Sequence, residues 1–171
     1  MTIDLGTGEV DELALRYEHV FDIRINFDKR WQWPVSGGQS VGYTSVGADC
    51  TVSGPRLNGR LVDHSGADWP IVRSDGVVEL NAHYVIAADD GAHIYIRNLG
   101  YVHGPLRTAG QPEESPPAIP RYFRCTPYFR APVGPHDWLN RTVVVGVGTR
   151  RPKLRPDDPP DHSLFRYYAV L

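Results

Sequence analysis

The sequence contains no run of apolar residues that approaches the roughly 20 needed to cross a membrane as a helix. It contains only two cysteines, Cys50 and Cys125, so a disulfide framework does not organise the fold and a reduced, cytoplasmic location is expected. The first ten residues lack the basic and apolar regions of a secretory signal peptide, which agrees with that expectation.

An excess of charge of one sign is also missing. The 171 residues carry 18 basic and 20 acidic side chains, which gives a net charge of −2. A nucleic-acid-binding domain needs a basic face, and the mixtures of aromatic and arginine residues in Trp31–Pro34 and Tyr122–Tyr128 do not supply one. We therefore expect neither a nucleic acid nor a membrane as a partner.

Stretches that favour long helices are scarce, because 17 glycines and 15 prolines interrupt the chain. Between them lie short runs rich in Val, Ile, Thr and Tyr, which are typical of strands. The length suits one domain. The sequence therefore predicts an N-terminal segment over 1–14, a short helix over Glu9–Leu15, and an all-β domain over 15–171.

Alternation of apolar and polar residues predicts eight or nine strands, most clearly in a hairpin around the turn Asp89–Gly91. The expected strands are Arg16–Phe27, Tyr43–Val52, Arg56–Asp63, Val77–Ala87, Ala92–Leu99, Arg121–Arg130, Leu139–Arg150 and Ser163–Leu171. Loops are expected over 28–40 and over the proline-rich stretches 104–120 and 151–161. We expect a single closed antiparallel β-barrel of about eight strands, because closure removes strand edges.

Motifs of cofactor and metal sites are absent. The sequence has no phosphate-binding loop, no dinucleotide-binding glycine motif and no serine nucleophile elbow. The seven histidines never occur at the spacing of a helical metal site. His83 and His93, with Glu79 as a third possible ligand, are interpreted as ordinary strand residues. We therefore expect no cofactor and no bound metal.

A polar face on the predicted hairpin and the strand after it is the main candidate for chemistry. Its members are Glu79, His83, Tyr95, Arg97, Tyr122 and Arg124. In one interpretation these side chains face water, and the apolar side chains between them fill the barrel. In the other they line a cavity, where a bound ligand satisfies part of the set, because buried polar groups need partners. The sequence leaves both interpretations open.

The second interpretation gives these six residues catalytic roles. The two arginines would hold an anionic oxygen, since a guanidinium is always charged and offers a planar pair of donors. The two tyrosines would donate hydrogen bonds or a proton, and Glu79 or His83 would act as the base. Such a set suits isomerisation, cyclisation or dehydration without a cofactor.

Two short segments place a large ring near a polar residue: Asp68 beside Trp69, and Trp138 near Asn140. Trp138 is interpreted as a packing residue and Asp68 as a turn residue, with ligand contact and acid catalysis as the alternatives. Asn140 either caps a turn or presents its amide to a ligand.

Several segments resemble, in the same order, the DUF3237 family, which is also called UPF0311. They are Ser53–Gly59, Gly66–Val77, Asp90–Gly100, Tyr122–Pro127, Trp138–Arg141 and Val145–Gly148. The resemblance covers about Leu15 to Leu171 and implies an allene-oxide-cyclase-like β-barrel. Because some members of the family belong to pathways for aromatic or polyketide-like compounds, it also implies isomerase or cyclase activity.

We expect a small-molecule ligand in the barrel lumen and a homo-oligomer. The first hypothesis is a cofactor-independent isomerase, cyclase or dehydratase that uses acid–base catalysis on an aromatic or polyketide-like carbonyl compound. The expected substrate-binding residues are Asp68, Trp69, Asn98, Thr126, Trp138 and Asn140. The alternatives are a non-catalytic ligand-binding barrel and an oligomeric structural protein.

Overall fold

The computed structural model describes residues 13–104, 120–153 and 155–171, and these form eleven strands and two short 3₁₀ helices. The strands are β1 (Tyr17–Val35), β2 (Gln39–Val46), β3 (Thr51–Ser53), β4 (Gly59–Leu61), β5 (Ala67–Asp68), β6 (Ile71–Val72), β7 (Val78–Ala88), β8 (His93–His103), β9 (Tyr122–Arg130), β10 (Val144–Arg151) and β11 (His162–Val170). The 3₁₀ helices are η1 (Ser36–Gly38) and η2 (Asp137–Asn140).

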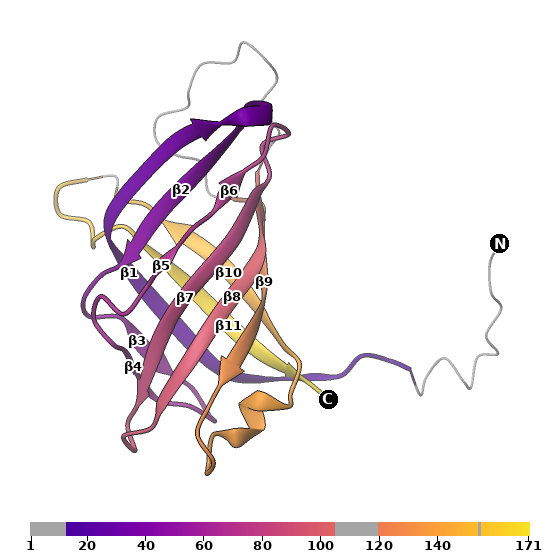
Figure 1. Cartoon of the computed structure of the whole chain (residues 1–171). Helices are drawn as coiled ribbons and strands as arrows, with labels where there is room; N and C mark the ends of the chain where they lie inside the picture. Colours follow the sequence, from indigo (N-terminus) through magenta and orange to yellow (C-terminus); the bar gives the residue numbers. More distant parts are fainter. Residues whose placement is uncertain (1–12, 105–119, 154) are drawn as a thin grey trace, which may run out of the picture.

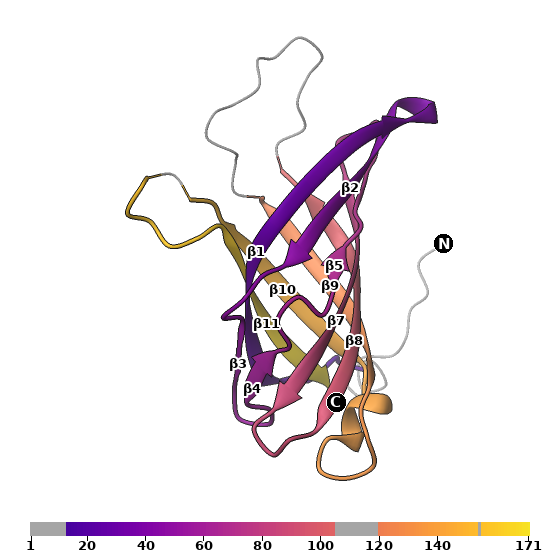
Figure 2. The same cartoon turned by 60° about the vertical axis from the view of Figure 1, so that its left-hand side comes forward.

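The strands form one antiparallel sheet that closes on itself (Figures 1 and 2). The hydrogen-bonded order runs β4-β3-β1-β11-β10-β9-β8-β7, and β7 pairs again with β4, which completes a ring of eight strands. Strands β2, β5 and β6 form the wall between β1 and β7 farther along the barrel. The predicted all-β architecture is confirmed, and closure protects the strand edges as expected.

The β7–β8 hairpin shows how the sequence pattern builds this wall. Tyr84 and Ile86 on β7 and Ile94 and Ile96 on β8 are buried, while the residues between them point away from the core. The turn ends at Gly91, whose φ of +89° lies in the left-handed region that glycine adopts readily. The hairpin predicted from alternation is therefore confirmed.

The expectation of a loop over Asp28–Ser40 is wrong. β1 and β2 continue through this segment as a hairpin that extends beyond the ring, and its glycines form only the tip (Figure 2). Trp31 stacks on Tyr43 across the pair with ring centroids 4.9 Å apart, and Tyr43 meets Trp69 edge-on at 4.7 Å. Cross-strand aromatic contacts of this kind stabilise paired strands, which explains why the segment is not a loop.

Two other predicted strands are divided differently. The strand expected over Tyr43–Val52 ends at Val46 and resumes as β3, after a turn in which Asp49 has a φ of 57°. The strand expected from Leu139 begins only at Val144, because Leu139 belongs to η2. The predicted helix over 9–15 and the excursion over 104–120 fall largely outside the described residues.

The end of the barrel that carries η2 is filled by apolar side chains. Its core includes Phe21, Ile23, Leu57, Leu61, Ile86, Ile94, Phe129 and Leu139. Trp138 lies beside this core, and the Arg56 guanidinium stacks on its ring at 3.8 Å. Cys50 and Cys125 are buried free thiols, as expected for small core residues, but only Cys125 lies in a strand, since Cys50 precedes β3.

Two glycines allow close approaches that no side chain would permit. A Cβ atom at Gly66 would lie 1.6 Å from the carbonyl oxygen of His83, so glycine is required where β5 meets β7. A Cβ atom at Gly148 would lie 2.7 Å from the ring of Phe123. The glycines of β10 therefore make room for aromatic rings inside the barrel, which is a packing role.

Candidate functional site

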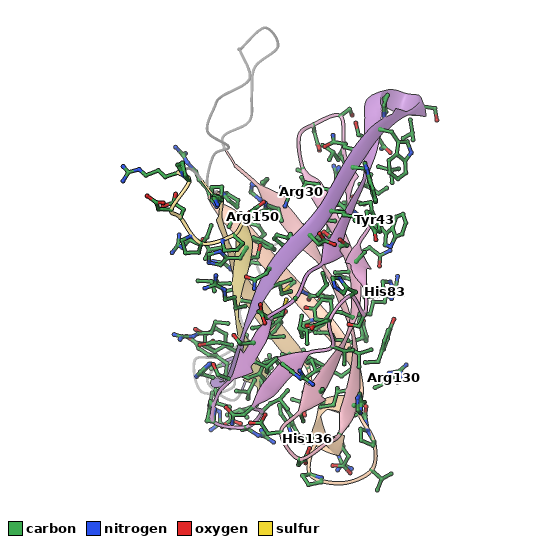
Figure 3. The ribbon with its side chains drawn as sticks, turned by 90° about the vertical axis from the view of Figure 1, so that its left-hand side faces the viewer. Arg30, Tyr43, His83, Arg130, His136 and Arg150 are labelled. Atoms are coloured by element: carbon green, nitrogen blue, oxygen red, sulfur yellow. The ribbon has the colours of Figure 1, made fainter. Side chains whose placement is uncertain are left out.

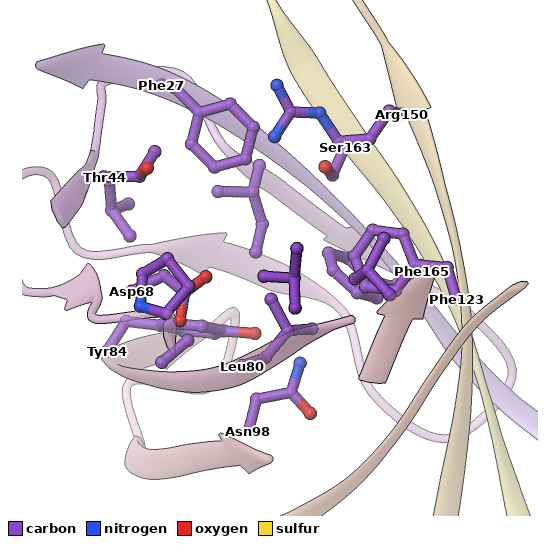
Figure 4. A pocket seen from close by; sticks show the side chains of 16 residues that line it. Phe27, Thr44, Asp68, Leu80, Tyr84, Asn98, Phe123, Arg150, Ser163 and Phe165 are labelled. Carbon is purple, nitrogen blue, oxygen red and sulfur yellow. The ribbon is translucent and has the colours of Figure 1, made fainter. Parts of the chain in front are cut away.

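A cavity of about 180 Å³ lies inside the barrel, and Figure 4 shows its walls. Most of the lining is apolar and includes Ile25, Phe27, Val46, Leu80, Phe123 and Phe165. The polar lining residues are Thr44, Asp68, Tyr84, Asn98, Arg150 and Ser163. Arg150 lies toward the opposite end of the barrel from His136, which precedes η2 (Figure 3). A cavity of about 150 Å³ is enough for a benzene-sized molecule, so this one suits a single-ring compound.

Asp68 supplies a carboxyl group to the wall. It pairs with Ala82 of β7, and its side chain lines the cavity whereas that of Trp69 is exposed. Its Oδ1 atom accepts a hydrogen bond of 2.9 Å from the backbone N–H of Asn81. Burial raises the pKa of Asp68 to about 6, against the opposing effects of that hydrogen bond and of the charge on Arg150. A carboxyl group with this pKa exchanges protons near neutral pH.

Tyr84, Asn98 and Tyr167 form a neutral polar cluster at the buried end of the cavity. Asn98 Nδ2 donates a hydrogen bond of 3.1 Å to the Tyr167 hydroxyl. Asn98 Oδ1 and the Tyr84 hydroxyl are buried and make no hydrogen bond of normal geometry among the described residues, although Tyr167 and Asn98 lie near enough to Tyr84 to act on its pKa. Burial raises the pKa of both tyrosines, so their hydroxyls keep their protons at neutral pH. Unpaired buried polar atoms are uncommon, and a ligand with its own donor and acceptor would satisfy this pair.

Arg150 brings a positive charge to the wall. Its Nη2 atom donates to both carboxylate oxygens of Asp161 at 3.1 Å, and Nη2 of Arg30 lies 2.9 Å from Asp161 Oδ2. Both guanidinium groups lie over the ring of Phe27, at 5.0 and 5.3 Å from its centroid. Burial, together with the charge on Arg30, lowers the pKa of Arg150, yet a guanidinium stays charged at neutral pH. Two cations therefore share one carboxylate here.

The expectation that the six predicted catalytic side chains line the cavity is wrong. None of Glu79, His83, Tyr95, Arg97, Tyr122 and Arg124 contributes to its lining. Alternation along β7, β8 and β9 turns Leu80, Ile96 and Phe123 inward and these neighbours outward. The interpretation in which the polar face meets water and apolar side chains fill the barrel describes the structure.

The outward polar residues satisfy one another. His83 Nδ1 hydrogen-bonds to the Tyr95 hydroxyl, and its Nε2 lies 3.1 Å from Asn81 Oδ1. Arg97 Nε donates to the same oxygen at 3.2 Å. Such a network explains why so many polar groups lie together without a ligand between them. Figure 3 shows His83 on the outside of the barrel wall.

The remaining outward residues are bound locally as well. Arg124 Nη1 donates to the backbone oxygen of Phe123, and its guanidinium lies 5.3 Å from the Tyr122 ring centroid. Glu79 pairs with Arg73 at 3.4 Å. These side chains therefore contact neighbouring residues of the barrel wall and its outer surface.

The six predicted substrate-binding residues separate into two groups. Asp68 and Asn98 line the cavity. Trp69 and Thr126 are exposed on the outer face, Asn140 hydrogen-bonds to the backbone of Ala131 through both amide atoms, and Trp138 packs against Arg56. The structure therefore brings Asp68 and Asn98 together at the cavity. Trp138 makes a packing contact, and Asn140 holds a loop.

Among the polar lining residues, sequence reasoning missed Thr44, Tyr84, Arg150 and Ser163. Each is a polar residue that shares the inward face of a strand with apolar or small neighbours. Arg150, for example, follows Val144, Gly146 and Gly148 at the two-residue period of β10. A single polar residue on an otherwise apolar strand face was the sequence pattern that could have identified these cavity residues.

The described residues hold no cluster of three or more His, Cys, Asp or Glu side chains suited to a metal ion. Among these residues, no helix has the length and apolar character needed to pass through a membrane.

Comparison with known proteins identifies the family. Residues 15–170 match the family described as "Protein of unknown function (DUF3237)". The chain belongs to this family. A UPF0311 protein of Clostridium acetobutylicum is 35% identical over 169 residues, which cover 91% of this chain and 94% of the relative. The resemblance drawn from the sequence motifs is thus confirmed.

Solved structures share the fold of this DUF3237 chain. A conserved protein of unknown function from Rhodopseudomonas palustris has a TM-score of 0.76 at 27% identity, with 92% of this chain and 99% of that chain covered. A β-barrel-like protein from Acinetobacter baumannii AYE has a TM-score of 0.74 at 25% identity, with coverages of 92% and 97%. An enzyme from Penicillium herquei has a TM-score of 0.63 at 17% identity, with coverages of 92% and 95%, and this likeness shows the fold alone.

Proposed function

We propose that this DUF3237 protein binds a small aromatic carbonyl compound in the barrel cavity and moves a proton on it, as an isomerase or cyclase without a cofactor. The observation that carries the proposal is the Asp68 carboxyl on the cavity wall, with a pKa of about 6. General acid–base catalysis is most effective when the pKa of the catalytic group lies near the working pH. Dehydration is a related outcome of the same proton transfer.

Asp68 takes the base role in this proposal. Its carboxylate removes a proton from the carbon next to the ligand carbonyl, and the electron pair of that C–H bond moves into an enolate. The same carboxyl then returns the proton to another carbon of the conjugated system. In a cyclisation, the enolate carbon instead attacks a second carbonyl carbon of the ligand, the C=O π pair moves to its oxygen, and that oxygen takes the proton from Asp68. No electrons are gained or lost overall, so the proposed reaction needs no redox partner.

Tyr84 and Asn98 take the role of oxygen partners. The Tyr84 hydroxyl, protonated and unpaired, donates to the oxygen on which enolate charge develops. Asn98 Oδ1 accepts from a hydroxyl group of the ligand. Tyr84 is the next inward residue after Ala82, the pairing partner of Asp68, so the base and this donor lie on adjoining parts of one wall.

Exchange of hydrogen for deuterium tests this proposal without knowledge of the natural substrate. The wild-type protein is incubated with acetophenone and related single-ring aryl ketones in D₂O, and loss of the proton signal next to the carbonyl is followed by NMR. We expect acceleration over buffer, and a decrease of at least about 100-fold in Asp68→Asn, as is usual when a general base is removed.

Glu79→Gln is the matched carboxylate-to-amide change on the outer face, and we expect it to retain the wild-type exchange rate. No acceleration by the wild type with any ketone of the set, or an Asp68→Asn variant as active as the wild type, would overturn the proposal.

A ligand-binding barrel without chemistry is the second candidate, and the mostly apolar lining of the cavity favours it. The same samples separate the two functions. A carrier binds the ketones, as line broadening or shifts of their NMR signals would report, but leaves their exchange rates at the level of buffer.

A further inference from the structure

The charges in direct contact with Arg150 do not cancel, although the Asp68 carboxyl also acts on it from the other side of the cavity. Arg30 and Arg150 face a single carboxylate, that of Asp161, so the group carries one excess positive charge. The contacts of Arg150 with Asp161 use only its Nη2 atom. Its Nε and Nη1 atoms have no hydrogen-bond partner among the described residues. Two charged donors thus stay available on a side chain that lines the cavity.

Ser163 adds a neutral donor beside this charge. It is the pairing partner of Arg150 between β10 and β11, it is buried, and it lines the same cavity. Its hydroxyl makes no hydrogen bond with other described residues. Figure 4 shows Ser163 next to Arg150, on the far side of the cavity from Asp68 and Tyr84.

The residues around Arg150 and Ser163 indicate which kind of molecule the cavity can hold. Phe27, Phe123 and Phe165 supply aromatic surface to the cavity, which suits a flat ring. The side chain of Arg150 is 29% exposed, whereas Asn98 is buried, so the positive charge lies at the solvent-facing end. A ring would therefore enter the cavity with an anionic substituent toward solvent.

We infer that Arg150 and Ser163 form a subsite for the carboxylate of a small aromatic acid. The inference rests on the proposed function in one respect, because it uses the same cavity for the ring. A monoanion matches the single excess charge of the Arg30–Arg150–Asp161 group. A dianion such as a phosphate monoester would exceed that charge, and the carboxylate of Asp68 across the cavity would repel it more strongly than a monoanion.

Calorimetric titration of the full chain with benzoate, benzamide and phenyl phosphate tests the subsite. Benzoate and benzamide have nearly the same shape and differ in charge. We expect benzoate to bind at least ten times more tightly than benzamide, since a charged hydrogen bond is lost with the amide. Benzamide binding as tightly as benzoate, phenyl phosphate binding more tightly than benzoate, or no benzoate binding at all would each overturn the inference.

Single substitutions test whether Arg150 and Asp161 determine the preference for benzoate over benzamide. Arg150→Gln should weaken benzoate at least ten-fold and leave benzamide unchanged. Arg130→Gln, an outer-face control on β9, should change neither. Asp161→Asn removes the carboxylate that competes for Arg150 and should tighten benzoate binding, a gain that an unfolded variant cannot produce. Wild-type benzoate affinity in either Arg150→Gln or Asp161→Asn would contradict the assignment.

The two proposals fail separately. Benzoate selectivity without ketone exchange would retain the carboxylate subsite and refute proton transfer by Asp68. Ketone exchange that depends on Asp68, with no preference for benzoate, would retain the catalytic proposal and refute the subsite.

Discussion

Asn98 and Tyr167 are joined by a hydrogen bond of 3.1 Å across the interior of the barrel, between β8 and β11. These strands are separated in the ring by β9 and β10, so the bond links two walls through the core. The nearby Tyr84 hydroxyl is equally buried but unpaired. The two tyrosines therefore make contrasting contributions to stability.

Removal of each hydroxyl measures this contrast. Tyr167→Phe leaves the Asn98 amide without its acceptor and should lower the free energy of unfolding by about 1–3 kcal/mol, the cost of a buried unpaired polar group. Tyr84→Phe removes a hydroxyl that makes no hydrogen bond of normal geometry among the described residues, and should be neutral or stabilising by up to about 1 kcal/mol. Urea denaturation at pH 7 measures both variants. Equal destabilisation by the two changes would show that Tyr84 is hydrogen-bonded in solution.

The pKa of Asp68 predicts a pH dependence of stability with a defined sign. Its folded-state pKa of about 6 exceeds the ordinary value of 3.8, so between these pH values the folded protein binds more protons than the unfolded chain. Stability attributable to this group therefore falls as the pH rises from about 4 to about 6, by at most about 3 kcal/mol. Asp68→Asn should match the wild type near pH 4 and exceed it at pH 8.

Asp75 provides the control of opposite sign. Its carboxylate accepts a hydrogen bond from the backbone N–H of Val77 and pairs with Arg73, and these contacts lower its pKa. Asp75→Asn should be less stable than the wild type at pH 8, and the difference should shrink as the pH falls through the range in which this carboxylate titrates. Denaturation curves at several pH values check both variants, and parallel pH profiles for them would contradict the argument.

Gly66 is predicted to be intolerant of any side chain. The Cβ atom of alanine would lie 1.6 Å from a backbone oxygen of β7, and backbone cannot move aside as a flexible side chain can. Gly66→Ala should cost about 3 kcal/mol or more and displace Asp68 from the cavity. The Cβ atom of Gly104→Ala meets no atom of the described residues within 4 Å, so this variant is the matched control. Thermal denaturation compares the two, and similar midpoints would refute the close approach.

The aromatic contacts of the extended β1–β2 hairpin are expected to be worth about 1–2 kcal/mol, from the cross-strand ring contacts and the surface they cover. Trp31→Ala removes the ring that stacks on Tyr43. Tyr128→Ala removes an outer-face ring that is 62% exposed and should change stability by less than about 0.5 kcal/mol. Chemical denaturation measures both variants, and equal effects would mean that the hairpin rings do not stabilise one another.

Strand periodicity predicted the barrel well because burial repeats every two residues on one face. The same periodicity could not say which polar residues lie inside. Tyr95 and Arg97 alternate with Ile94, Ile96 and Asn98 on β8, and the sequence shows two faces without showing which one closes on the cavity. The apolar face is the inward one, and its single polar member, Asn98, is the informative residue.

Other parts of the site depend on contacts between distant segments. Asp161 precedes β11 and reaches both Arg30 of β1 and Arg150 of β10, an arrangement that no local pattern reveals. The pKa of Asp68 likewise follows from its burial in the closed barrel. The sequence did not predict the β1–β2 extension, because glycines and a proline in this segment are typical of a loop. The stacking of Trp31 on Tyr43 across the two strands stabilises their pairing.

The two buried thiols give the barrel an internal reporter of its own opening. Burial raises the pKa of Cys50, and that of Cys125 to about 12, so neither supplies thiolate to an alkylating reagent while the strands stay closed. Cys125 lies on β9, where a ring strand must separate from its neighbours before reagent can enter. The alkylation rate of Cys125 therefore reports how often β9 separates from its neighbours. The alkylation rate of Cys50 reports the opening of the segment that precedes β3.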